Sequence, residues 1–399
     1  MLHDKDNIAK PGAIIFGGYV QGLSYVRNLG KKGVPVAILD NYPPSIASKS
    51  KYCKYFSKYP DPVKDEEKFI KFLMSIRKKF KGWLLIPTHD EELVALSKHS
   101  SLLKKDFRLT FPGWSIIANI VDKSRFYRKI SGIAPIPKTI IPENLSQVEE
   151  AKDSLKYPVL VKPSIGYLFY RSTITKGMIA KSPNELVEAY VDVSRIDPQP
   201  ILQEYIEGPP TNLYSFLSII SPNGKIRLAF TGRKVLQIPT DLGTASVAET
   251  IDCPPVKEIG LKVLRRLGFF GLSQVEFKYD PKDNEYKVLE VNGRGIKWIE
   301  IASPFESIAW MLYKTFTDTE CEESRCDLWK DRIEWIHLAD ILRHIVRKEI
   351  KPTQALSYIF NCKVKTWACA SLTDGLPFII QWIHMFHVFR RKKRLLVAI

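Results

Sequence analysis

The sequence predicts a mixed α/β protein with more than one domain, and three observations support this. An apolar run at 13–16 ends at Gly17-Gly18 and is followed by helical spacing over 21–29 and by a second apolar run at 34–40. This is the order of a doubly wound sheet. Farther along, two apolar runs joined by the turn 281–284 predict an antiparallel hairpin. Because 399 residues exceed one ordinary core, we expect two or three subdomains.

The glycines of the first turn indicate what the first domain does not bind. Gly17, Gly18 and Gly22 follow the pattern G-G-x-x-x-G, whereas dinucleotide-binding proteins use G-x-G-x-x-G. A tight turn with close helix–strand packing is therefore favoured over NAD binding. A further strand at 83–86 leads into three acids at 90–92, which suit a helix N-terminus and need no other role. By about residue 120 one α/β domain is complete.

The middle of the chain contains further short strands. Residues 157–164 are predicted to form a strand with Lys162 near its end, and 166–177 a loop. Residues 201–208 are another strand, and Pro222-Asn223-Gly224 is the turn of a hairpin. A charge that closes a buried V-L-V strand needs a partner, so Lys162 is a better functional candidate than most lysines here.

The hairpin about 281–284 places polar side chains together. Glu290 and Asn292 are two apart on an apolar strand and so share a face. Pairing about the turn puts Glu276 opposite Glu290, within a residue or two of register. Buried carboxylates this close repel each other unless they are paired, and Mg²⁺ prefers such oxygen ligands. From these residues alone, a metal site and a structural ion cluster that includes Arg294 stay equally open.

Composition narrows the class of partner. The formal net charge of +17 favours an acidic partner, either a nucleotide, a nucleic acid or an anionic membrane, although lysines and arginines that simply decorate the surface are favoured over nucleic-acid binding. The chain lacks zinc-finger spacing and basic–aromatic repeats, so we expect no specific nucleic acid. The six cysteines form no C-x-x-C pair and the seven histidines no H-E-x-x-H motif. The polar N-terminus and the lack of a long apolar run predict a cytoplasmic protein.

Taken together, these features resemble the ATP-grasp superfamily over most of residues 12–305, in particular its carbamoyl-phosphate-synthetase-like and D-aspartate-ligase-like carboxylate–amine ligases. The most specific element is E-x-N-x-R at Glu290, Asn292 and Arg294, with Glu276 fourteen residues upstream of Glu290. The resemblance implies a Rossmann-like pre-ATP-grasp α/β domain, a two-lobed α+β ATP-grasp fold and a mostly helical C-terminal extension. The implied regions are the pre-ATP-grasp domain (1–120), the small lid lobe with the segment leading into it (121–205), the large lobe with the metal site (206–320) and the extension (321–399).

The resemblance also implies roles for single residues. Glu276, Glu290 and Asn292 would hold two Mg²⁺ ions, with Mn²⁺ as a substitute, on the phosphates of ATP. Arg294 would contact the transferred phosphate or the acyl phosphate, and Lys162 would assist catalysis by bridging phosphates. The positions that match nucleotide-contacting residues are Lys123, Lys162, Glu204, Tyr205, Ile206 and Asn212.

The segment 232–245 resembles the lining of the phosphate-acceptor pocket, where Arg233 and Lys234 would face a carboxylate or a phosphate. Three departures stand out. Gly293 replaces a common proline, and 167–171 replaces a loop that is usually rich in glycine and serine. An acid that commonly contacts the ribose is absent from 209–212, which leaves ribose recognition to Asn212.

The resemblance predicts an ATP-dependent ligase that activates a substrate carboxylate as an acyl phosphate and joins it to an amine. Small-molecule carboxylates and amines are the implied partners. Two alternatives remain: a catalytically degenerate ATP-grasp module that binds or senses nucleotide, and an enzyme that phosphorylates carbamate or bicarbonate. The oligomeric state and the identity of both substrates stay open.

The C-terminal region lies outside the resemblance. Residues 333–346 are predicted to form one amphipathic helix, and 373–377 a turn. Residues 378–389 are apolar and aromatic, and 390–394 are five consecutive cations. This pattern is typical of peripheral attachment to an anionic membrane through 378–399, at its inner face. A helix packed on the core with a solvated tail explains the pattern too, and is slightly favoured.

Overall fold

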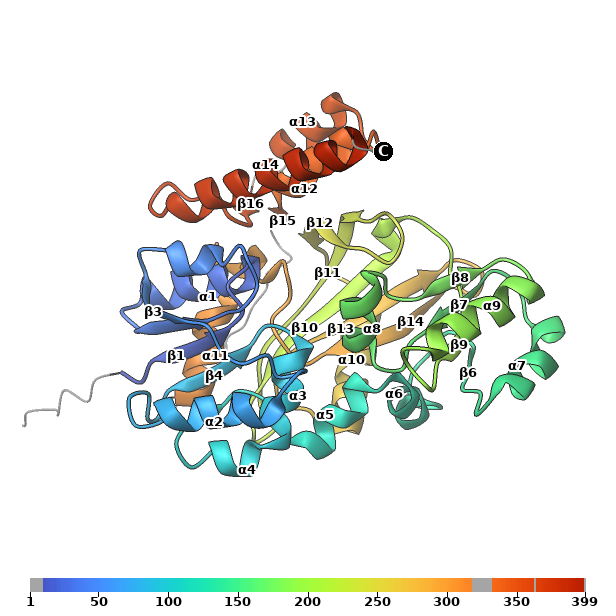
Figure 1. The fold of residues 1–399 in the computed structure, drawn as a ribbon, viewed down its shortest axis with the longest axis horizontal. Coiled ribbons are helices and arrows are strands. Elements are labelled where there is room, and N and C mark those ends of the chain that lie inside the picture. The colour runs from blue at the N-terminus through green and yellow to red at the C-terminus, as the bar shows by residue number, and fades with distance from the viewer. Residues whose placement is uncertain (1–9, 318–331, 362–363, 398–399) are drawn as a thin grey trace, which may run out of the picture.

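The computed structural model describes residues 10–317, 332–361 and 364–397, with side chains described as far as His387. Within these residues three sheets of five, four and seven strands carry the fold, and helices cover them (Figure 1). The predicted α/β class is therefore confirmed.

The first sheet is parallel, with strand order β3-β2-β1-β4-β5. Ile15 of its central strand faces one hydrophobic core, while Ile14 and Phe16 face a second core on the other side, as the period of a strand requires. This is the doubly wound arrangement that the sequence predicted. The elements are β1 (Ala13–Phe16), α1 (Val20–Gly30), β2 (Val36–Leu39), η1 (Ile46–Lys49), β3 (Cys53–Ser57), α2 (Glu66–Ile76), β4 (Leu84–Pro87), α3 (Asp90–Lys98), α4 (Ser100–Leu103), β5 (Arg108–Leu109) and α5 (Trp114–Val121).

The turn after β1 has the structural role that its glycines indicated. Gly17 has a φ of 97°, which disfavours any side chain, and a Cβ there would lie 2.3 Å from Thr88 Oγ1. A Cβ on Gly22 would lie 2.1 Å from the carbonyl oxygen of Gly17. Close packing of α1 on the turn therefore requires both glycines.

The second sheet is the antiparallel core of the small lobe, in the order β6-β9-β7-β8. Val159 and Val161 face Leu186 and Val193 of its longest helix in a separate hydrophobic core. The elements are α6 (Lys123–Ile130), β6 (Thr139–Ile140), α7 (Leu145–Ala151), η2 (Lys152–Ser154), β7 (Val159–Lys162), α8 (Gly166–Thr173), β8 (Met178–Ala180), α9 (Pro183–Ser194) and β9 (Ile201–Glu204).

The helix α8 corrects one prediction. We expected a loop over 166–177, but residues 166–173 are helical. No glycine or proline interrupts 167–173, and Phe169 is 2% exposed because it packs into the core of the small lobe. A segment rich in glycine would stay irregular here. Because Phe169 can be buried, this segment forms a helix instead.

The third sheet has the order β14-β13-β10-β11-β12-β15-β16. Its strands are antiparallel except for the last pair, β15 and β16. Both predicted hairpins are present, one between β10 and β11 and one between β13 and β14. The elements are η3 (Pro210–Asn212), β10 (Leu213–Ile220), β11 (Ile226–Ile238), β12 (Thr244–Thr250), α10 (Pro254–Leu267), β13 (Gly271–Asp280), β14 (Glu285–Asn292), η4 (Ile299–Ala302), α11 (Ile308–Thr317), β15 (Ile333–Ile336) and β16 (Val364–Trp367).

The strand β15 corrects a second prediction, that of one helix over 333–346. Residues 333–336 pair with β12, Val247 opposite Ile336, and only α12 (Leu338–Val346) is helical. Trp335 is fully buried on one side of the strand. The unpaired edge of β12 offers backbone hydrogen bonds to this segment, and they outweigh its helical spacing.

The C-terminal region packs against both of its neighbours, above the first domain and the edge of the third sheet (Figure 1). It contains α13 (Pro352–Phe360) and α14 (Leu376–Val397). Asp374, in the predicted turn, accepts a hydrogen bond of 2.9 Å from Arg27 Nε of α1 and one of 2.7 Å from Ser50 Oγ. Burial alone would raise the pKa of Asp374. Its hydrogen bonds, of which the one from Arg27 has the largest effect, outweigh burial, so the pKa is lowered. Among the described residues, none of the helices has the length and apolarity needed to cross a bilayer.

Candidate active site

The hairpin of β13 and β14 brings the predicted metal ligands together. Glu276 is the direct cross-strand partner of Glu290, and Gln274 is the partner of Asn292. Asn292 Nδ2 lies 3.3 Å from Glu290 Oε1 and 3.1 Å from Gln274 Oε1. Neighbouring residues such as Val275 point the other way into a hydrophobic core, so strand alternation holds the polar face in place.

Lysines surround this polar face. Lys234 Nζ of β11 lies 3.0 Å from Glu276 Oε1 and is 4% exposed. Lys162 Nζ, at the end of β7, donates to Gln203 Oε1 at 2.7 Å and is 9% exposed. The electrostatic neighbours of Glu290, in decreasing order of effect, are Lys176, Lys123, Lys162 and Lys234.

These charges determine the protonation states. Burial raises the pKa of Glu290, but the four lysines outweigh it and lower the pKa to about 2. Burial and the neighbouring Lys123 lower the pKa of Lys162 to about 8. Burial also lowers the pKa of Lys234, against the opposing effect of Glu276. At neutral pH the carboxylate is thus ionised within an excess of positive charge.

The oxygen ligands at this site suit a magnesium ion that is also bound to phosphate groups better than a metal ion held by protein side chains alone. Within the described parts of the chain, no three His, Cys, Asp or Glu side chains are grouped to hold a metal. Glu276 and Glu290 supply carboxylate oxygens, and Asn292 supplies an amide. Magnesium commonly takes one or two carboxylates and completes its shell with water and phosphate oxygens. The four lysines outnumber the two carboxylates, so the site also suits an anion of several negative charges.

Arg294 lies beside this face and is held by the first domain. Its Nε and one terminal nitrogen lie 2.7 and 2.8 Å from the two carboxylate oxygens of Asp90, the first residue of α3. It also donates to Asn292 Oδ1 at 3.2 Å. Burial lowers the pKa of Arg294, but Asp90 outweighs burial and raises it, so the guanidinium stays charged. The sequence position of Asp90 indicated only a role at the N-terminus of a helix. In the structure Asp90 also holds the guanidinium of Arg294.

The predicted adenine hinge follows β9. Glu204 Oε2 accepts a hydrogen bond of 3.3 Å from the backbone N–H of Lys138 and lies 3.5 Å from Lys287 Nζ. The hydroxyl of Tyr205 donates to Asp241 at 3.2 Å. Ile206, the next residue, is buried, with 9% of its surface exposed.

Two other predicted residues lie apart from the carboxylate cluster. Arg233 pairs with Glu249 at 2.6 Å, whereas Lys234, one residue later, pairs with Glu276. Adjacent strand residues face opposite sides, so the structure does not bring Arg233 and Lys234 together. Asn212 lies in η3 beside Gly208, where an added Cβ would be 2.8 Å from its amide nitrogen.

The sequence interpretation missed four residues near the site. Gln274 shares the polar face and was detectable from its register in the hairpin. Lys278 has a pKa of about 8, lowered by burial and then by Lys234. Lys176 and Asp90 carried no local signal, because one is among many lysines and the other is distant in sequence from Arg294.

Comparisons with known proteins agree with this geometry. No protein-family model matches the chain. It is 25% identical over 253 residues to D-aspartate ligase of Enterococcus faecium (strain Aus0004), a match that covers 59% of this chain and 58% of that protein. The chain thus spans little more than half the length of this curated relative.

Solved structures show the same fold. N5-carboxyaminoimidazole synthetase from Staphylococcus aureus complexed with ADP has a TM-score of 0.63 at 17% identity, covering 79% of each chain. L-amino acid ligase from Bacillus licheniformis has a TM-score of 0.59 at 16% identity, covering 76% of this chain and 74% of that one. In sequence, in fold and in its E-x-N-x-R hairpin, this chain is similar to ATP-grasp carboxylate–amine ligases.

Proposed function

We propose that this protein is an ATP-dependent and magnesium-dependent ligase that activates a carboxylate and joins it to an amine. The observation that carries the proposal is the Glu276–Glu290 pair within a group of four lysines. Nucleotide-sensing modules need no such ligand set, so it favours catalysis over sensing. The D-aspartate ligase and L-amino acid ligase matches support the same class of reaction.

The side chains have separable tasks in this proposal. Glu290, with Glu276 on one side and Asn292 on the other, would be shared by two Mg²⁺ ions, or Mn²⁺ in their place. When bound, the metal neutralises charge on the phosphates of ATP. Lys162 and Lys123 add positive charge at the phosphates, as phosphoryl transfer needs alignment and neutralisation more than covalent help from the protein.

The reaction would proceed in two displacements. A carboxylate oxygen of the first substrate attacks the terminal phosphorus of ATP, and ADP leaves, which gives an acyl phosphate. The amine nitrogen of the second substrate then attacks the acyl carbon, inorganic phosphate leaves, and the nitrogen loses a proton. Arg294 uses two donors on Asp90 and one on Asn292, so its remaining N–H groups are available to the developing phosphate charge.

The nucleotide base would be held at the hinge. Backbone groups near Ile206 would contact the adenine, with Glu204 and Tyr205 beside it and Asn212 near the ribose. Lys287, which pairs with Asp280 at 2.8 Å and approaches Glu204, would keep the Glu204 carboxylate in place.

The proposal is tested by removing the charge of Glu290. We expect Glu290→Ala to lose phosphate release that depends on added substrate, across a panel of amino, sugar and peptide acids, each tested with and without an amine. Glu285→Ala is the matched control, because Glu285 is an exposed carboxylate on the same strand. Turnover by Glu290→Ala equal to the parent's would contradict the assignment.

A parent protein that binds Mg·ATP but releases phosphate with no substrate pair would favour the sensor alternative. Release with bicarbonate or carbamate alone would favour the second alternative.

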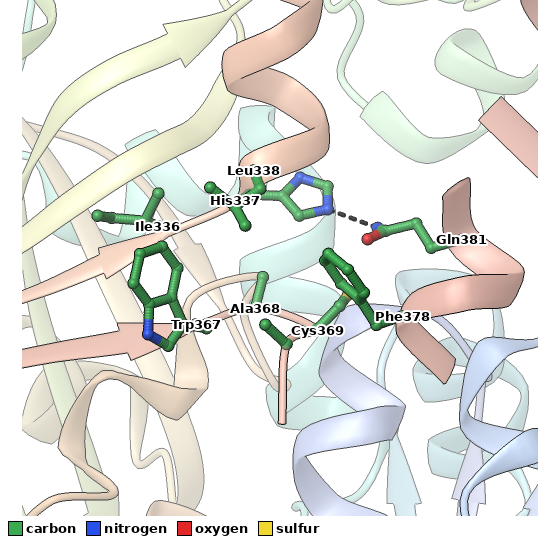
Figure 2. Close-up of a pocket in the computed structure, with 9 residues that line it drawn as sticks. Ile336, His337, Leu338, Trp367, Ala368, Cys369, Phe378 and Gln381 are labelled. Carbon is green, nitrogen blue, oxygen red and sulfur yellow. Dashed lines mark hydrogen bonds between the residues drawn. The ribbon is translucent and has the colours of Figure 1, made fainter. Parts of the chain in front are cut away.

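We also propose that α14 contacts an anionic membrane surface. One face of this helix is fixed to the core: Gln381 hydrogen-bonds His337 at 2.6 Å (Figure 2), and Met385 is 2% exposed. The other face carries four apolar side chains that are each about half exposed, with spacings of three, four and three residues. They are Leu376, Ile379, Ile383 and Phe386.

The residues that follow this apolar stripe favour anionic lipid as its partner over a second copy of the helix. Residues 390–394 are five consecutive arginines and lysines, and like charges disfavour pairing of this helix with a second copy of itself. Cations beyond an apolar helical face suit a surface of anionic lipid. The small-molecule ligase chemistry does not depend on this contact.

A vesicle experiment tests the membrane contact. We expect the parent to sediment with vesicles that contain phosphatidylglycerol, less so in high salt, and not with phosphatidylcholine alone. The double variant Ile383→Ser, Phe386→Ser should lose this binding, since it keeps Gln381 and Met385 and hence the packed face. Equal binding by the double variant, or a parent dimer that this variant dissociates, would overturn the proposal.

A further inference from the structure

The helix α8 connects parts of the molecule that are distant in sequence. It belongs to the small lobe, but its Arg171 reaches the first domain. One terminal nitrogen of Arg171 lies 2.5 Å from Asp61 Oδ2, and the other lies 3.1 Å from Asp61 Oδ1. The second of these nitrogens also donates to the hydroxyl of Tyr42 at 3.0 Å and lies 3.8 Å from Glu91 Oε1.

The other end of α8 lies near Lys123 and Lys162, the lysines that we propose to contact the phosphates. A Cβ on Gly166 would lie 2.9 Å from Lys123 Nζ, and Lys123 N donates to the backbone oxygen of Ser164 at 2.9 Å. Lys162 lies four residues before this helix and Lys176 three residues after it. One short helix therefore spans the distance between the lysines of the phosphate site and the carboxylate of the first domain.

The backbone at the end of α8 is an independent sign that the helix is held in place. Ile174 caps it with a φ of 61°, in the left-handed region, and its side chain is 77% exposed. A β-branched residue rarely adopts this conformation, and it persists only where the surroundings enforce it. Since the exposed Ile174 side chain gains little from burial, the constraint comes from the helix that precedes it.

We propose that Arg171 is a positioning residue whose ion pair with Asp61 holds α8 across the site, and so keeps the small lobe closed on a bound nucleotide. This inference rests on the proposed function, because it assigns the nucleotide to the Lys123–Lys162 side of α8. Arg171 would not touch the reacting atoms. It fixes the position of the elements that carry the lysines, and the same closure keeps water from an activated acyl group.

The test uses nucleotide affinity, which needs no knowledge of the other substrates. We expect Arg171→Ala and Asp61→Asn each to weaken binding of Mg·ADP roughly fivefold, a typical coupling between two linked events, as measured by isothermal titration calorimetry. The double variant Arg171→Ala, Asp61→Asn should lose no more affinity than Arg171→Ala alone, because Arg171→Ala already breaks the ion pair that Asp61→Asn removes. Arg171→Lys should recover part of the loss.

The matched control is Arg195→Ala, which removes an exposed ion pair with Asp192 in the same lobe. Amide hydrogen exchange gives a second readout. With Mg·ADP bound, residues 166–177 should exchange faster in Arg171→Ala than in the parent, and not in Arg195→Ala. Unchanged affinity and exchange in Arg171→Ala would overturn the inference while leaving the ligase proposal intact. A parent that binds no Mg·ADP would instead contradict the proposed function itself.

Discussion

Replacing Lys162 by methionine should make the nucleotide-free protein more stable while it removes nucleotide binding. The side chain is 9% exposed, and burial lowers its pKa from the ordinary 10.5 to about 8. A lysine with a lowered pKa disfavours the folded state wherever it must stay protonated. Methionine keeps the apolar part of the side chain and removes the charge.

The magnitude follows from the pKa. A change from 10.5 to about 8 corresponds to about 3 kcal/mol of unfolding free energy lost at pH 7. The variant recovers this, but Gln203 Oε1 loses its 2.7 Å donor, which costs about 1–2 kcal/mol. We therefore expect a net gain of about 1–2 kcal/mol.

The dependence on pH identifies the cause. The cost of the lysine is fully present below pH 8, and it fades as pH rises toward 10.5, where the unfolded lysine also loses its proton. The gain measured by urea unfolding should therefore be full at pH 7 and smaller at pH 10. Lys181→Met, at an exposed lysine of the same lobe, should show neither effect.

Added nucleotide should reverse the order of stability. Mg·ADP at a hundredfold its dissociation constant stabilises the parent by about 2.7 kcal/mol, and the variant should gain little. A variant that is less stable than the parent at pH 7, or whose gain is the same at pH 10, would refute the reasoning.

Three further outcomes follow from neighbouring residues. Glu290→Gln should destabilise the protein by up to about 3 kcal/mol at pH 7, because the carboxylate whose pKa is lowered to about 2 stabilises the fold above its ordinary pKa of 4.5. Urea unfolding checks this, and a difference from the parent that does not shrink as pH falls from 4.5 toward 2 would speak against it. Asp90→Asn should lower turnover about 100-fold through misplacement of Arg294 and leave the calorimetric affinity for Mg·ADP nearly unchanged; a matching loss of affinity would show a general structural role. Ile174→Gly should raise the melting temperature, because it relieves left-handed strain of about 1–2 kcal/mol at an exposed side chain, and a lower melting temperature would contradict the strain.

The core of the candidate site could be predicted from local pattern. Strand alternation places Glu290 and Asn292 on one face, and the short turn limits which residue of the partner strand can face them. The structure has Glu276 directly opposite Glu290. These relations hold within about twenty residues of chain, where spacing nearly determines geometry.

The errors in secondary structure came from segments whose pattern suits two states. Residues 333–336 have helical spacing, but they pair with β12, which lies more than eighty residues earlier in the chain. The segment after Lys162 looked like a loop by its place in the chain, but the core of the small lobe accepts Phe169 and makes it helical. In both cases a distant partner decided the outcome.

The sequence by itself determined the α/β class, the two hairpins and the clustering of Glu276, Glu290 and Asn292, because these follow from periodicity and turn chemistry over short distances. Only the tertiary structure decided which charges meet. Arg294 binds Asp90 and Arg171 binds Asp61 across separations of 204 and 110 residues. Side chains on different lobes acquire neighbours only when the lobes pack, and local spacing holds no record of that packing.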